Sequence, residues 1–226
     1  MSGLWVSLVP LIIGSALVPI QIVITTLLLR SDSGRLTAVA WVAGMTTVRL
    51  AQGVVFGLIL GTAAEAGSSS GGEGSGVPLL LLAVAILFYM AALKQLLRHP
   101  DEDEPPPKWM AKIEDATPRR AYLLGVGLLA IGAKVWVFTL GAISVIADAG
   151  MSQGASILTF LVFVILAESI HLALLGIAYA MPDRSSAALD RVAGFLADKN
   201  RVLVIGLGLV FGTWFLLKAL SGLGLI

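Results

Sequence analysis

Four ionisable residues lie near the middle of long apolar segments, where each needs a partner, water or a function. Glu168 and His171 stand near the middle of residues 160–179, a run long enough to cross a bilayer as a helix. Arg49 and Lys134 lie about midway along two other apolar segments. A charged side chain at that depth costs at least about 2.5 kcal/mol on insertion scales. Three residues apart on a helix, Glu168 and His171 share a face.

Two interpretations of these residues remain open. In the first, Arg49 or Lys134 pairs with Glu168 in a buried ion pair that fixes the register of the helices. In the second, the two fixed cations outnumber the one carboxylate and form a cavity that attracts an anionic group. Glu168 and His171 would then accept and release protons. The excess of positive groups favours the second interpretation.

Proline and glycine predict where the apolar segments are broken. Pro10, Gly14 and Pro19 lie close together near the start of the chain, and Gln21 follows them. Proline removes a backbone donor and kinks a helix, and transporters use such breaks to expose backbone to a substrate or ion. We therefore treat these three residues and Gly132 as candidate gating positions, and Gln21 as a candidate substrate contact. A simple packing kink is the alternative.

Other chemistries have little support in the sequence. The Glu-x-x-His spacing of Glu168 and His171 occurs in di-metal bundles, but there in two copies, and the other histidine here, His99, lies beyond the apolar segments. Cysteine is absent, and so is a Walker-type glycine loop for ATP. We expect no enzymatic activity, no metal or other cofactor and no nucleic-acid partner.

The composition is typical of an all-α polytopic membrane protein. Of 226 residues, 58% are hydrophobic and 13% are charged, and the mean hydropathy is +0.95. Lysine and arginine gather in the first, third and fifth loops, which the positive-inside rule places in the cytoplasm, so both termini are expected outside. Six transmembrane helices are predicted, over residues 4–29, 36–60, 78–97, 121–146, 154–180 and 202–225.

The six helices are predicted to form two inverted three-helix repeats. The segment around Gly14 aligns with the segment around Gly132 at an offset of 118 residues, and the same offset carries Arg49 to the position before Glu168. The predicted organisation is a first repeat over 1–97, a cytoplasmic linker over 98–120, and a second repeat over 121–226 with an amphipathic connector over 183–200.

Two stretches resemble a known family. Residues 14–45 (GSALVPIQIVITTLLLRSDSGRLTAVAWVAGM) and Leu189–Leu220 resemble the GAP family, the glycopeptidolipid- and sulfolipid-addressing proteins, within the LysE transporter superfamily. Superfamily members commonly carry an Asn-Pro-Lys step in the fourth helix. This chain has Gly132-Ala133-Lys134, so the lysine matches and the other two residues do not.

The resemblance implies a transporter of the bacterial cytoplasmic (inner) membrane with a LysE-like arrangement of helices. The leading hypothesis is an exporter or flippase-like carrier that moves an envelope glycolipid or other anionic amphiphile outward, with proton coupling. The alternatives are a LysE-type exporter of amino acids, cations or other small solutes, and a non-transporting accessory subunit of a lipid synthesis or export complex. Expected partners are membrane lipids, lipid-export machinery, or a second copy through Gly206, Gly208 and Gly212.

Cysteine labelling tests the predicted topology, and the absence of native cysteine gives an unreactive background. Ser70→Cys is expected to react with an impermeant maleimide added to intact cells, whereas Ser186→Cys is expected to react only after permeabilisation. The reverse pattern would contradict the predicted orientation.

Overall fold

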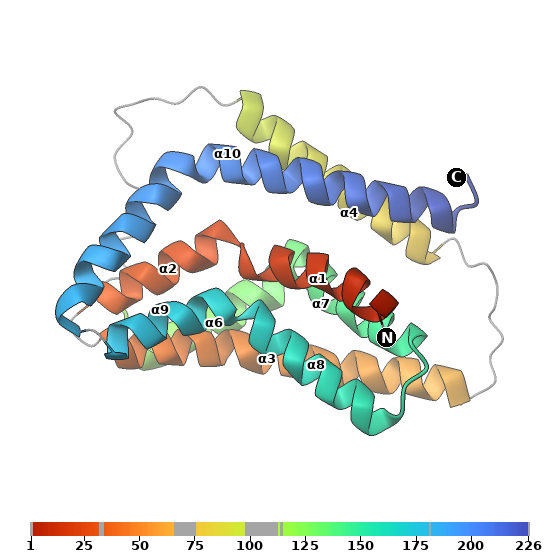
Figure 1. Cartoon of the computed structure of the whole chain (residues 1–226), viewed down its shortest axis with the longest axis horizontal. Coiled ribbons are helices and arrows are strands. Elements are labelled where there is room, and N and C mark those ends of the chain that lie inside the picture. Colours follow the sequence, from red (N-terminus) through yellow and green to blue (C-terminus); the bar gives the residue numbers. More distant parts are fainter. Residues whose placement is uncertain are drawn as a thin grey trace. The chain divides into compact units, whose positions relative to one another are not determined.

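The computed structural model describes residues 2–31, 34–65, 76–97, 113, 115–180 and 182–225, and these are helical with short connections (Figure 1). For some helical residues only the backbone is described. The helices of this part of the chain are α1 (Ser2–Ala16), α2 (Pro19–Arg30), α3 (Gly34–Glu65), α4 (Gly76–Leu97), α6 (Pro118–Ile131), α7 (Ala133–Asp148), α8 (Gln153–Ala167), α9 (Ser169–Ala180) and α10 (Pro182–Gly222).

The apolar helices are those of a membrane protein. Within the described residues, two segments are long and apolar enough to cross a membrane unbroken, Gly34–Leu58 of α3 and Arg201–Gly222 of α10. Three pairs, α1 with α2, α6 with α7 and α8 with α9, are bent by 49°, 68° and 58°, and counting each pair as one span gives up to five spans among the described residues. The arrangement of six spans in inverted repeats stays a prediction.

One expectation about helix continuity was wrong. Residues 154–180 form two helices that meet at Glu168, although neither proline nor glycine lies there to signal a break. Conversely, the connector predicted over 183–200 and the last helix are continuous in α10. Residues 195–203 contain no proline or glycine, so nothing in the local sequence ends the helix between them.

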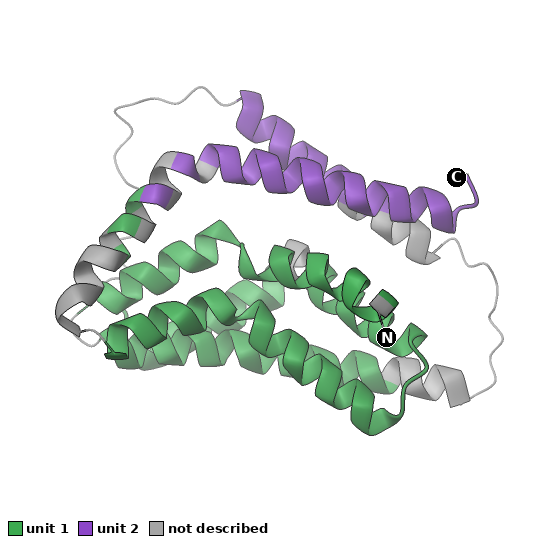
Figure 2. Cartoon of the chain, viewed as in Figure 1, with its two compact units in different colours: residues 1–62, 106–194 green, residues 63–105, 195–226 purple. Residues whose placement is uncertain are grey.

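The chain divides into two compact units (Figure 2). Unit 1 comprises residues 1–62 and 106–194, and unit 2 comprises residues 63–105 and 195–226. In unit 1, α1 packs against α7 and α8, and α2 packs against α9. In unit 2, α4 packs against the C-terminal part of α10. Each unit therefore combines segments from both halves of the sequence.

The long helix α3 organises unit 1. Arg35 lies over the ring of Tyr179 in α9, and further along α3 the backbone of Gly53 lies against the ring of Phe160 in α8. Helix α3 thus runs antiparallel to α9 and then to α8. A core of apolar side chains from α2, α3, α6 and α9 surrounds Trp41, and it includes Ile113 from the predicted linker.

Helices α3 and α6 cross without intervening side chains. A Cβ atom added at Gly44 would meet the carbonyl oxygen of Tyr122, and one added at Gly125 would meet the carbonyl oxygen of Trp41. Backbone atoms cannot move aside as side-chain ends can, so the crossing requires glycine at both positions.

Unit 2 is built on a similar close approach. A Cβ atom at Gly208 of α10 would lie 2.8 Å from the Cβ atom of Ala92 in α4, and one at Gly212 would lie 3.3 Å from the ring of Tyr89. Phe88 of α4 packs against two rings of α10, those of Phe211 and Phe215. Gly208 and Gly212 were proposed from the sequence as a contact face for a second copy. In the structure they contact α4 of the same chain.

A matched pair of substitutions tests the glycine crossing. Gly125→Ala is expected to lower the free energy of unfolding by about 1–3 kcal/mol, because the methyl group overlaps backbone of α3. Gly127→Ala on the same helix meets nothing within 4 Å and should be neutral or slightly stabilising. The measurement is unfolding in mixed detergent micelles. Equal losses for the two variants would contradict the crossing.

Candidate functional site

The first helix break lies before Pro19. Helix α1 continues through Pro10 and Gly14 to Ala16, and α2 begins at Pro19, whose missing N–H is tolerated at the start of a helix. Gln21 follows in the first turn of α2 and is fully buried. Of the three candidate gating residues near the N-terminus, Pro19 is therefore the one at the bend.

The second break lies at Gly132, between α6 and α7. The indole Nε1 of Trp136 donates a hydrogen bond of 2.8 Å to the carbonyl oxygen of Leu129, which satisfies a carbonyl at the end of α6. Lys134 lies in the first turn of α7, but its side chain is outside the described part of the structure.

The third break is the residue Glu168 itself. Its backbone leaves the helical conformation with φ −93° and ψ 3°, between α8 and α9. The turn is still closed by backbone hydrogen bonds, from Glu168 N–H to Val164 and from Leu172 N–H to Glu168. His171 follows in the first turn of α9, and both side chains are buried.

Arg49 of α3 is the charge that meets Glu168. The Nε atom of Arg49 donates to Oε1 of Glu168 at 2.8 Å. Its Nη1 atom donates to the hydroxyl oxygens of Ser15 in α1 and Thr139 in α7, at 3.2 Å and 3.3 Å. The guanidinium is fully buried, so these contacts replace its hydration. One side chain thereby joins α3 to α1, α7 and the α8/α9 break.

A second set of hydrogen bonds holds His171. The hydroxyl oxygen of Thr25 lies 2.9 Å from Nδ1 of His171 and accepts from the indole of Trp41 at 3.0 Å. The single hydrogen of this hydroxyl donates to the carbonyl oxygen of Gln21 at 2.9 Å. Nδ1 of His171 must then be the donor to Thr25, which leaves Nε2 of a neutral ring with a lone pair.

That lone pair faces the carboxylate. Nε2 of His171 lies 3.9 Å from Oε2 of Glu168, and neither atom has a hydrogen-bond partner within the described residues. Two lone pairs facing each other in a buried site are unfavourable, whereas one proton on either atom makes the interaction attractive. The geometry suits Glu168 and His171 to hold one proton between them.

Other buried polar atoms of the site also lack partners among the described groups. They are Nη2 of Arg49 and the side-chain amides of Gln21 and Gln52. An unpaired buried donor or acceptor costs about 1–3 kcal/mol, so such atoms are suited to bind water or polar groups of a ligand. The site therefore has unused hydrogen-bonding capacity on both its cationic and its anionic sides.

The structure brings together Arg49, Glu168 and His171 from the residues selected in the sequence, and it places Gln21 one helical turn from Thr25. The sequence reasoning missed five contributors. Gln52 could have been found from the sequence, because it lies three residues after Arg49 and therefore on the same face of the helix. The hydroxyl residues and the indole did not stand out by type or spacing. The missed residues are Ser15, Thr25, Trp41, Gln52 and Thr139.

A double-mutant cycle tests the ion pair. Glu168→Gln alone is expected to lower the free energy of unfolding by about 3 kcal/mol, because it leaves the guanidinium buried without a counter-charge. Arg49→Met alone should cost a similar amount, and combining it with Glu168→Gln should cost less than the sum of the two single losses, because the double variant buries neither charge without its partner. Unfolding in mixed micelles measures all three, with the exposed Lys218→Gln as a control expected within about 0.5 kcal/mol. Additive losses would contradict a direct interaction.

Comparison with known proteins supplies a family. No curated protein and no solved structure matches the chain. A family model described as Sap, sulfolipid-1-addressing protein, matches residues 8–221, which is nearly the whole sequence. This chain belongs to the family of Sap, the sulfolipid-1-addressing protein.

Proposed function

We propose that this protein moves a sulfolipid, or another amphiphile with an anionic headgroup, outward across the bacterial cytoplasmic membrane. Membership of a sulfolipid-addressing family and the apolar helices support a lipid-related role in a membrane. The observation that carries the proposal is the buried cluster of Arg49, Glu168 and His171 at a helix break, with unused donors and acceptors. A LysE-like inverted repeat is part of the same proposal.

The charge balance of the cluster supplies a transport step. A sulfate group is a permanent anion that matches the planar donor array of a guanidinium. While Glu168 is ionised and bound to Arg49, a second anion in this buried site is repelled. Once Glu168 takes up a proton, the guanidinium needs a new counter-charge, and the headgroup provides it. Release of the proton restores the ion pair and expels the anion.

His171 is the residue placed to exchange that proton. Its Nε2 atom faces Oε2 of Glu168, while its Nδ1 atom is bonded to the hydroxyl of Thr25, which also accepts from Trp41. A headgroup bound at Arg49 would also meet the free amides of Gln21 and Gln52 if its sugar hydroxyls enter the site. The cluster thus offers one cation for the sulfate, one acid for the proton and two amides for hydroxyls.

Reconstitution into liposomes tests the function. We expect outward movement of a fluorescent sulfated glycolipid that exceeds movement of the same lipid without sulfate by about tenfold or more, since a charged hydrogen bond in a buried site contributes about 1.5–3 kcal/mol. Radiolabelled amino acids should not move. Movement of amino acids alone would favour a small-solute exporter, and movement of neither with a stable co-purifying partner would favour an accessory subunit.

The pH dependence of transport in the same assay tests the role of the proton. Glu168→Gln is expected to remove the pH dependence of transport per folded molecule, whereas Lys218→Gln keeps it. Transport by Glu168→Gln that retains a normal pH dependence, accompanied only by lower stability, would leave Glu168 a structural counter-charge.

A further inference from the structure

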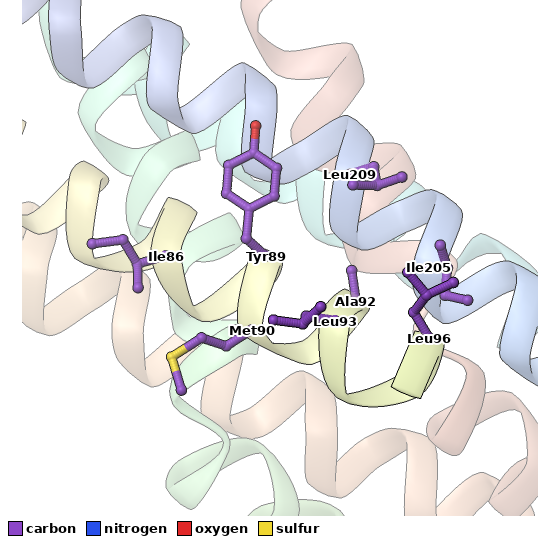
Figure 3. A pocket seen from close by; sticks show the side chains of 8 residues that line it. All are labelled: Ile86, Tyr89, Met90, Ala92, Leu93, Leu96, Ile205 and Leu209. Atoms are coloured by element: carbon purple, nitrogen blue, oxygen red, sulfur yellow. The ribbon is translucent and has the colours of Figure 1, made fainter. Parts of the chain in front are cut away.

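Unit 2 contains an apolar groove between α4 and α10, apart from the polar cluster of unit 1 (Figure 3). Its volume is about 400 Å³. The lining side chains come from successive turns of α4 and from two turns of α10. They are Ile86, Tyr89, Met90, Ala92, Leu93, Leu96, Ile205 and Leu209.

The interior of the groove has no free polar group for a ligand. Tyr89 is the one lining residue with a polar side-chain atom, and its hydroxyl is hydrogen-bonded to the hydroxyl of Thr213 at 2.8 Å. Several lining side chains, including Met90 and Leu93, are more than half exposed. A sugar or a peptide backbone would leave its donors and acceptors unpaired here, whereas a hydrocarbon chain would not.

Two basic side chains lie at one end of the groove. Because α4 and α10 are antiparallel, Arg201 lies at the Leu96 end, where its Nη2 atom donates to the Leu96 carbonyl oxygen at 2.9 Å. This bond uses one of five guanidinium donors. Lys94 lies one turn beyond Met90 on the same side of α4 and is exposed. Arg201 and Lys94 can each interact with the anionic headgroup of a lipid whose acyl chain lies in the groove.

We infer that this groove binds one acyl chain of an anionic membrane lipid, whose headgroup is held by Arg201 and Lys94. The positive-inside pattern predicts that these residues face the cytoplasm, so the lipid would come from the inner leaflet. The inference does not rest on the proposed transport function, because a lipid can bind to this groove of unit 2 whether or not the protein is a transporter.

Native mass spectrometry of the full chain in detergent measures this binding. The probes are dioleoyl phosphatidylglycerol and dioleoyl phosphatidylcholine, which have the same acyl chains and differ in headgroup charge. We expect the first bound phosphatidylglycerol to be preferred by at least about fivefold, the effect of one basic residue near a membrane surface, about 1 kcal/mol. Equal binding of the two lipids would overturn the inference.

Matched variants locate the site. Arg201→Gln and Lys94→Gln should each reduce the preference about fivefold, while Arg201→Lys keeps the charge and most of the preference. Lys218→Gln, which removes an exposed charge near the other end of α10, should change nothing. An equal loss with Lys218→Gln would indicate unspecific charge attraction and overturn the inference.

A bulky substitution tests the binding of the acyl chain independently of the binding of the headgroup. Leu93→Trp should fill the groove and weaken binding of both lipids, whereas Leu97→Trp adds the same bulk at an exposed residue outside the lining. Unchanged binding in Leu93→Trp would place the lipid elsewhere. Melting temperatures in the same detergent confirm that each variant is folded.

Discussion

A permanently charged guanidinium inside a membrane protein is the constraint that the rest of unit 1 satisfies. Arg49 cannot lose its proton at any relevant pH, so its environment must supply a counter-charge and hydrogen-bond acceptors. Glu168 supplies the charge, and Ser15 and Thr139 supply acceptors from two further helices. Four parts of the chain are thereby tied to one side chain, although the desolvation cost of a buried ion pair can offset its attraction.

The bend at Glu168 coincides with the contact to Arg49. No proline or glycine breaks the helix there, and the carboxylate that ends α8 is the one that binds Arg49. The other two breaks have local causes, proline at the first position of α2 and glycine before α7. Two breaks are therefore encoded by backbone chemistry, and the third accompanies a contact between residues that are 119 positions apart.

How far the sequence predicts this structure depends on the kind of signal. Charged residues in apolar segments stand out in the sequence because a charge inside the membrane costs several kcal/mol. The long apolar segments themselves mark the positions of the helices. Hydroxyl residues are less informative, because they commonly bond to their own helix, as Thr26, Thr46 and Thr159 do. Thr25 makes the same local bond and additionally reaches His171 and Trp41. Only the three-dimensional packing distinguishes it from its neighbour Thr26.

The glycine crossing of α3 and α6 has a mechanical consequence. The two backbones meet at Gly44 and Gly125 without interdigitated side chains, so backbone atoms fix the distance between the helices there. Arg49 lies five residues from Gly44, about 7.5 Å along the axis, whereas the ends of α3 are much further away. Because backbone atoms make this contact, the crossing also sets the separation of α3 and α6 within two helical turns of the guanidinium.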